Sequence, residues 1–108
     1  MKLHIKDRLL IPSLFPEKGN FMEYNLKKAI LKKIAITDKD REDYGIVENQ
    51  DEKRIEWNLQ KDAEVPFVAE FSKEELEYLH NACEAISEQK LTDDLWIVVE
   101  HIYNETQS

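Results

Sequence analysis

The chain has 108 residues, 42% of them hydrophobic and 35% charged, with a formal net charge of −8. This length predicts a single domain spanning residues 1–108, and the apolar fraction together with the scarcity of Gly and Pro disfavours low-complexity and disordered classes. The negative charge disfavours direct binding to DNA or RNA, because nonspecific affinity for nucleic acids comes mainly from neutralising phosphates.

The cysteine count and the apolar runs bear on where the protein works. Cys83 is the only cysteine, so no internal disulfide can form and a reducing compartment is expected. The longest apolar runs fall far short of the ~20 residues that cross a bilayer, and residues 1–7 lack the apolar block of a secretory signal. We therefore predict a cytoplasmic protein with no membrane partner. No cofactor is predicted either.

Charge is distributed unevenly along the chain. Residues 1–36 hold eight Lys or Arg and three Asp or Glu, a net of +5, whereas residues 37–108 hold seven and twenty, a net of −13. Such a distribution favours a basic protein partner, or imitation of nucleic acid in the groove of a DNA-binding protein. The simpler alternative is that the charge only keeps the protein soluble.

The N-terminal segment predicts a short helix and a turn. Apolar residues recur at helical spacing from Leu3, but Pro12 removes an amide donor, so the first helix should kink or end near Ile11. Pro16 and Gly19 predict a turn, in which Gly19 accepts a positive φ and lets the backbone reverse.

A second helix is predicted from Met22 to Ile34, with Phe21 closing the preceding corner. A single glycine is too few for a phosphate-binding loop, so we interpret this stretch as a corner. The opposite face of the helix carries Asn25, Lys28 and Lys32. Its inward face comprises Met22, Leu26, Ala29, Ile30 and Ile34.

In the middle of the chain the spacing of apolar residues changes from a helical to an alternating pattern. Thr37 is expected to cap a short helix that ends at Tyr44, with Gly45 as the residue that terminates it. Residues 46–48 and 54–58 are then predicted to form two antiparallel strands, in which Ile55 and Trp57 alternate with charge and face inward. Residues 65–71 are expected to add a third strand, with Pro66 at an edge.

The C-terminal third predicts a helical hairpin. Ser72 and Glu75 form a capping-box pattern ahead of a helix that should run to about Gln89. Thr92 caps a final helix, and the chain is expected to fray from Asn104. The predicted fold class is therefore α+β, with short N-terminal helices, a small two- to three-stranded antiparallel sheet and a C-terminal antiparallel helical hairpin. The inward residues are Leu76, Leu79, Ala82, Cys83 and Ile86 on the first helix and Leu95, Val98, Val99 and Ile102 on the second.

Three side chains are candidates for chemistry. His80 and Cys83 are three residues apart on one predicted helix, and antiparallel packing could bring His101 near them as a metal ligand. His80 and Cys83 could also form a nucleophilic pair, but a mid-helix cysteine lacks the N-terminal dipole that activates a thiol. We favour the alternative, in which Cys83 is a small buried residue with His80 at the edge of the apolar stripe. We therefore predict neither a metal site nor catalytic residues.

The order of elements over residues 4–58 resembles that of a winged helix, with Thr37 to Tyr44 in the recognition position. That segment, TDKDREDY, holds two positive and four negative charges, which does not suit a reader of the major groove. A winged-helix shape here would predict a protein-binding derivative. The aromatic residues Trp57, Trp96 and Phe67 are candidates for interface anchors, but in a small domain such residues are more often core.

Several motifs occur together along the chain. They are a leucine-rich opening, a turn from Pro16 ending in Gly-Asn-Phe, a lysine-rich helix, Tyr-Gly-Ile at residues 44–46, Ile-x-Trp-Asn at residues 55–58 and an acidic, capped helical pair. Over nearly the whole chain this combination resembles small hypothetical proteins of bacteriophages and mobile elements of gut bacteria, with Pro12 as a departure. The resemblance implies a phage or prophage origin, and hence a host cytoplasm, and it carries over no catalytic residue.

These observations predict a function in protein binding. We expect a non-enzymatic, phage-type accessory protein whose acidic helical hairpin contacts a protein partner through Glu77, Glu84 and Glu88. Two alternatives stay open: inhibition of a host defence or DNA-binding protein by nucleic-acid charge mimicry, and a small virion or assembly component. A stable oligomer would favour the structural role, and a monomer that captures a basic nuclease or repressor would favour inhibition.

Overall fold

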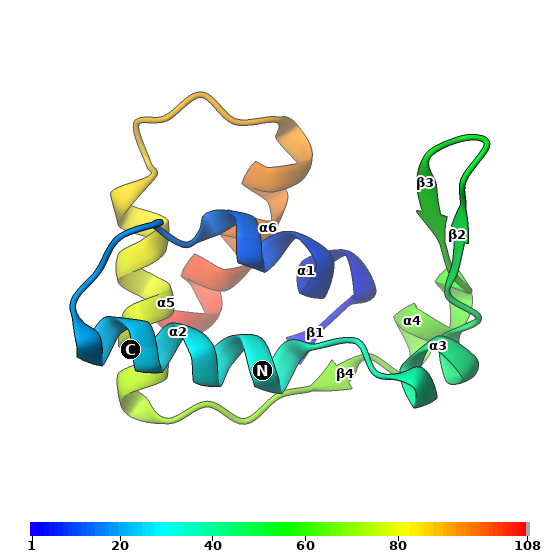
Figure 1. Cartoon of the computed structure of the whole chain (residues 1–108), viewed down its shortest axis with the longest axis horizontal. Helices are drawn as coiled ribbons and strands as arrows, with labels where there is room; N and C mark the ends of the chain where they lie inside the picture. The colour runs from blue at the N-terminus through cyan, green and yellow to red at the C-terminus, as the bar shows by residue number, and fades with distance from the viewer. Residues whose placement is uncertain (108) are drawn as a thin grey trace.

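The computed structural model describes residues 1–107 and confirms the predicted α+β class (Figure 1). These residues form helices and two small antiparallel sheets of two strands each. In chain order the elements are β1 (Lys2–Leu3), α1 (Ile5–Leu10), the 3₁₀-helix η1 (Ile11–Leu14), α2 (Phe21–Ile34), α3 (Asp38–Tyr44), β2 (Val47–Asn49), β3 (Arg54–Glu56), α4 (Leu59–Glu64), β4 (Phe67–Val68), α5 (Lys73–Ala85) and α6 (Asp93–Thr106).

The first helix ends where proline predicts. The last residue of α1 is Leu10, and the chain then tightens into η1, which holds Pro12 in its first turn. Strand β1 was not predicted, and it pairs with β4 through Leu3 and Phe67. Residues 65–71 therefore do contribute a strand, but the prediction that it extends the β2–β3 sheet is wrong.

The turn before α2 corrects two expectations. Gly19 does not adopt a positive φ; instead, a Cβ at this position would lie only 3.1 Å from Cβ of Glu23. Glu23 is held close because it forms a capping box with Asn20, whose Oδ1 accepts a hydrogen bond from Glu23 N at 2.8 Å. Phe21, which was expected to close the corner, is 78% exposed.

Helix α2 covers the predicted range, but its inward face is shorter than expected. Ile30 and Ile34 are buried, and Leu26 is half-buried. Met22 is instead 71% exposed, because the groove between α2 and α5 stays open beside the first turn of α2. Helical periodicity thus identified the inward face of α2 correctly, but fewer of its residues are covered by the rest of the protein than predicted.

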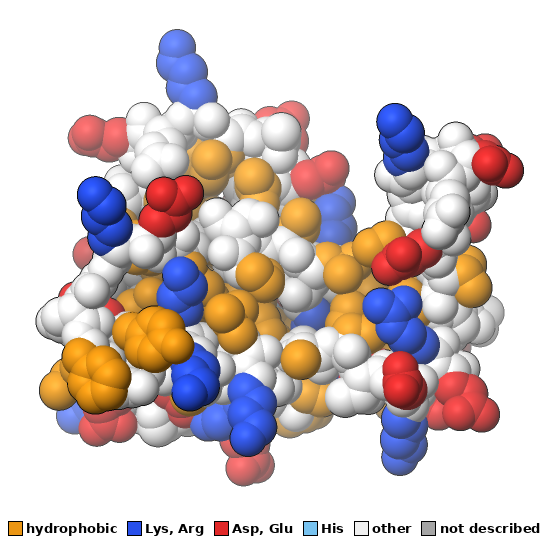
Figure 2. Space-filling view, in the orientation of Figure 1, with side chains coloured by type: hydrophobic (Ala, Val, Ile, Leu, Met, Phe, Trp, Pro, Cys, Tyr) orange, Lys and Arg blue, Asp and Glu red, His pale blue; other side chains and the backbone are white. Residues whose placement is uncertain are grey.

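Helix α3 confirms the local predictions, and the predicted hairpin is present with different strand ends. Thr37 accepts a hydrogen bond from Asp40 N at 3.1 Å, and Gly45 ends α3 at φ +60°. The hairpin rises from α3 and α4 and stands apart from α1, α5 and α6 (Figures 1 and 2). For this reason Val47 and Ile55 are exposed, and the expected inward face of this sheet is not formed.

Apolar side chains form two clusters. Trp57 packs against the smaller cluster, and Trp96 and Phe67 pack against the larger one; all three are half-buried, in line with the core interpretation. The smaller cluster comprises Ile5, Tyr44 and Ile46. The larger cluster comprises Leu3, Ile11, Leu14, Phe15, Ile30, Ile34, Ala69, Tyr78, Leu79, Ala82, Cys83, Val98, Val99 and Ile102.

A buried arginine joins α1 to the α2–α3 connection. Arg8 donates from Nε to the Ile34 carbonyl at 3.0 Å and from Nη2 to the Ala35 carbonyl at 2.7 Å and to Asp40 at 2.8 Å. Its guanidinium also lies 4.0 Å from the ring centroid of Phe67. Burial opposes ionisation of Asp40, but the hydrogen bonds from Arg8 and Thr37 outweigh this effect and lower the pKa of the carboxyl.

The C-terminal helical hairpin is confirmed with corrected ends. The predicted inward residues of α5 and α6 are buried or half-buried, including Leu79, Cys83 and Ile102. Helix α5 ends at Ala85 and does not reach Gln89, while α6 continues to Thr106 where fraying was expected. The extension is supported by the Thr106 hydroxyl, which donates to the Ile102 carbonyl at 2.8 Å.

The winged-helix order of elements is present, but α3 belongs to the smaller cluster, where Tyr44 and Ile46 pack with Ile5 of α1. Among residues 1–107, no helix combines the length and apolar character that crossing a membrane requires.

Candidate functional site

The α5–α6 hairpin is anchored to the rest of the protein through its first turn. Ser72 and Glu75 form the predicted capping box, with Ser72 N donating to Glu75 Oε1 at 2.7 Å. Lys33 of α2 donates to the same carboxylate at 2.5 Å. Burial opposes ionisation of Glu75, but the bonds from Lys33 and Ser72 prevail, so its pKa lies below the ordinary value. Glu75 therefore holds α5 against α2 and is not free to bind a partner.

A groove follows the outer side of the α5–α6 contact as two adjoining hollows that share Tyr103. The hollow near the end of α6 has a volume of about 490 Å³ and is lined by Glu77, His80, Asn81, Tyr103, Thr106 and Gln107. The second has a volume of about 450 Å³ and is lined by Cys83, Glu84, Ser87, Trp96, Val99, Glu100 and Tyr103. The groove thus combines an aromatic floor, made by Trp96 and Tyr103, with carboxylates from both helices.

His80 ties the two helices together within this groove. Its ring stacks on Tyr103 of α6, with 4.7 Å between the ring centroids and 21° between the planes. Its Nδ1 lies 3.0 Å from Thr106 Oγ1, and its Nε2 lies 3.0 Å from Glu84 Oε1. These contacts fix the orientation of Tyr103 and Glu84, so the groove is preorganised.

Cys83 lies beneath the groove as an apolar residue. Its side chain is buried, and Sγ lies 3.8 Å from the Val99 carbonyl. Burial, reinforced by the charge of Glu84, raises the pKa of the Cys83 thiol to about 11. A thiol with this pKa is almost entirely protonated at neutral pH, which does not suit a nucleophile.

The hairpin is strongly acidic. Residues 73–106 hold nine Asp or Glu and two Lys, a net of −7, against −8 for the whole chain. Glu75 is paired with Lys33, and Asp94 with Lys6 at 2.6 Å. The other seven carboxylates are exposed and form no ion pair with a Lys or Arg among residues 1–107. They are Glu74, Glu77, Glu84, Glu88, Asp93, Glu100 and Glu105.

The structure brings together two of the three predicted contact residues. Glu77 and Glu84 line the groove, whereas Glu88 is exposed in the turn beyond the end of α5 and lines neither hollow. Glu100 completes the rim from α6 and was missed by sequence reasoning. Its signal was the spacing of Trp96, Glu100 and Tyr103 at i, i+4 and i+7, which places them along one stripe of a helix.

The residues weighed as metal ligands lie in different environments. His80 contacts Thr106 and Glu84, while His101 donates from Nε2 to the Lys2 carbonyl at 2.9 Å. Within residues 1–107, no three His, Cys, Asp or Glu side chains are grouped as a metal site would require.

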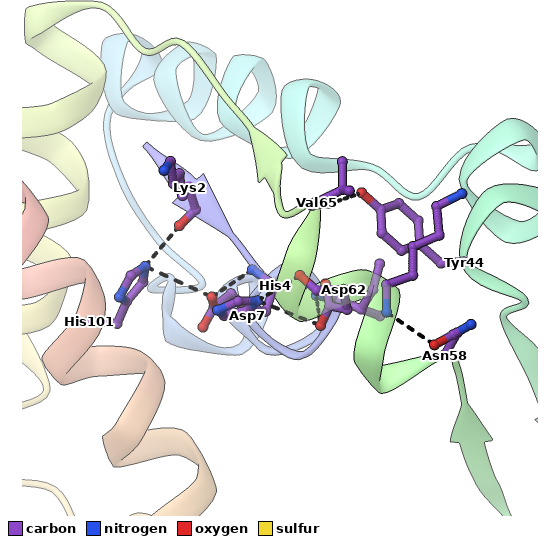
Figure 3. Close-up of polar contacts among 10 residues, drawn as sticks. Lys2, His4, Asp7, Tyr44, Asn58, Asp62, Val65 and His101 are labelled. Carbon is purple, nitrogen blue, oxygen red and sulfur yellow. Dashed lines mark hydrogen bonds and ion pairs between the residues drawn. The ribbon is translucent and has the colours of Figure 1, made fainter.

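A second polar cluster surrounds the start of α1 (Figure 3). Asp7 accepts from His4 N at 2.9 Å, and Asp62 of α4 accepts from Ile5 N at 3.1 Å. His101 lies 3.9 Å from Asp7, and His4 Nδ1 lies 3.7 Å from Asp62. The buried carboxylates of Asp7 and Asp62 both accept hydrogen bonds from backbone amides at the N-terminus of α1. The cluster therefore connects α1, α4 and α6 and has a structural role.

Comparisons of the chain with models of protein families, with curated proteins and with solved structures find no match. The groove, its charge and its aromatic floor therefore carry the functional argument.

Proposed function

We propose that this protein binds a basic segment of another protein in the groove between α5 and α6. The observation that carries the proposal is the aromatic floor of Trp96 and Tyr103 together with Glu77, Glu84 and Glu100, three lining carboxylates that have no Lys or Arg partner among residues 1–107. An Arg or Lys side chain placed there would pair with carboxylates and stack over an aromatic face. The resemblance to phage proteins remains a prediction, and the role proposed here is one of binding.

The charge of the hairpin also determines how binding should proceed. Seven exposed carboxylates without Lys or Arg partners attract a cationic surface over about a Debye length, so they speed association more than they slow dissociation. We therefore expect affinity to fall as salt is raised.

The test is affinity purification from the native host with three tagged forms of the full chain. The groove variant E84K/E100K reverses two rim charges. The control variant E42K/D51K makes the same change in net charge at exposed residues of α3 and the hairpin loop. We expect the wild type and the control to capture the same basic protein, and the groove variant to bind it about tenfold more weakly or worse. Equal loss from both variants would mean that only net charge matters, and no loss from either would place the interface elsewhere.

Charge mimicry of nucleic acid is a second candidate, favoured by the net charge of −7 on residues 73–106. In that case the captured protein is a nucleic-acid-binding protein, and duplex DNA competes with the chain for it. A captured protein whose binding is indifferent to duplex DNA would reject mimicry and leave the groove proposal standing.

A further inference from the structure

We propose that the first turn of α2 is the centre of a two-fold interface between two copies of this chain. The inference uses a surface that adjoins the α5–α6 groove and shares Glu77 with it, and it goes beyond the proposed function. Exposed apolar patches on small proteins mark interaction sites when they are contiguous. Here Phe21, Met22 and Tyr24 are 78%, 71% and 56% exposed within a single helical turn.

The two aromatic rings of the patch stack on a capped helical turn. The rings of Phe21 and Tyr24 stack with their centroids 6.5 Å apart and their planes at 17°. The Asn20–Glu23 capping box holds the turn beneath them through two hydrogen bonds. A preorganised aromatic patch loses little conformational entropy on binding, so it can act as an anchor.

On the Met22 side the patch continues into a groove between α2 and α5. This groove has a volume of about 390 Å³ and an apolar floor that includes Leu26, Tyr78 and Ala82. The α5 residues on its edge include the carboxylates of Glu74 and Glu77, both exposed. A second copy can therefore place its own Phe21 or Met22 beside or into this groove.

On the Tyr24 side the charge has the opposite sign. Lys18 and Lys27 line the hollow next to Tyr24, and Lys28 follows one turn later on α2. These three Lys outnumber the two acidic residues of the hollow, Glu17 and Glu23, and Glu23 is engaged in the capping box with Asn20. Figure 2 shows hydrophobic side chains gathered at the start of α2, at the lower left, with blue Lys side chains beside them. The patch thus separates an acidic flank from a basic flank.

The two oppositely charged flanks favour one kind of binding partner. A uniformly basic partner would be repelled by the Lys flank, and a uniformly acidic partner by the Glu flank. A second copy related by a two-fold axis places each acidic flank against the basic flank of its neighbour, because an isologous contact reverses the direction of the patch. Like charges facing each other across an interface are strongly unfavourable, so this complementarity favours self-association.

The test is sedimentation equilibrium of the full chain over a concentration series. We expect a monomer–dimer equilibrium above the monomer mass of 12.8 kDa. The variant F21S/M22S should raise the dimer dissociation constant at least about tenfold. The matched control L59S/I97S removes two apolar residues that are 71% and 61% exposed elsewhere on the surface, and it should leave the constant unchanged.

Charge variants test the two-fold geometry. E74K/E77K makes both flanks basic, and K18E/K28E makes the Lys flank acidic. Each variant alone should associate more weakly than the wild type, and an equimolar mixture should recover association, since opposite flanks then meet. A wild type that stays monomeric at about 1 mM overturns the proposal and leaves the patch to a different protein. Species larger than a dimer that grow with concentration, or a mixture that fails to associate, would also overturn the two-fold arrangement.

Discussion

Replacing Arg8 by Met should lower the free energy of unfolding by about 3–5 kcal/mol, the range for removing one partner of a buried ion pair. Arg8 has a side chain with no exposed surface, and Asp40 has one that is 16% exposed. Met retains the apolar stem but removes the donor to two carbonyls at the end of α2 and the cationic partner of Asp40, which keeps only its hydrogen bonds from Thr37. Nη1 of Arg8 already lacks a partner, which favours the lower end of the range.

The size of this loss is measurable because small domains are stabilised by only about 5–15 kcal/mol. The assay is urea unfolding at pH 7 followed by the fluorescence of Trp57 and Trp96. Arg54→Met is the matched control: that side chain is 62% exposed and contacts only surface carboxylates, so its loss should cost no more than about 1 kcal/mol. If R8M costs less than about 1 kcal/mol, Arg8 does not hold α2 and α3 together as described.

Three further outcomes are expected. Gly45→Ala should lower the free energy of unfolding by about 1–2 kcal/mol. Because φ is +60° and no neighbour would contact the added Cβ, the whole loss would come from backbone strain. A smaller loss for Gly45→Asn in the same unfolding assay would support this cause, and equal losses would count against it. The Cys83 thiol, with its pKa raised to about 11, should react with a disulfide reagent at pH 8 far more slowly in the folded protein than in denaturant, and equal rates would contradict its burial. Folding lowers the pKa of the Glu75 carboxyl. The stabilisation that Glu75 contributes is therefore present above its unfolded pKa of about 4.3 and is lost as pH falls through the folded value. The unfolding free energy of E75Q should therefore fall less than that of the wild type on acidification below pH ~4, and parallel curves would refute this linkage.

The elements that were predicted correctly depend on contacts within a few residues. Pro12 ends α1, and the side chains of Thr37 and Ser72 accept hydrogen bonds from amides three residues later. Gly45 supplies the positive φ at the end of α3. Such interactions form between neighbours in the chain, so residue type and spacing are sufficient to identify them.

The elements that were missed depend on distant partners. Strand β1 has two residues, too few for any periodicity, and exists because Leu3 meets Phe67. Helix α4 has six residues, and its Asp62 accepts from the amide of Ile5. No local pattern marks a contact between residues so far apart in the sequence.

Some properties of the two candidate surfaces are likewise local, and others depend on distant contacts. The sequence alone determined that the α5–α6 hairpin would be acidic and capped, because charge and capping are properties of neighbouring residues. Only the tertiary structure decided that Glu100 joins Glu84 over an aromatic floor, and that Phe21 and Met22 face outward. Periodicity identifies which residues share a helix face, but whether that face is covered depends on a second element, and the position of that element is a property of the whole fold.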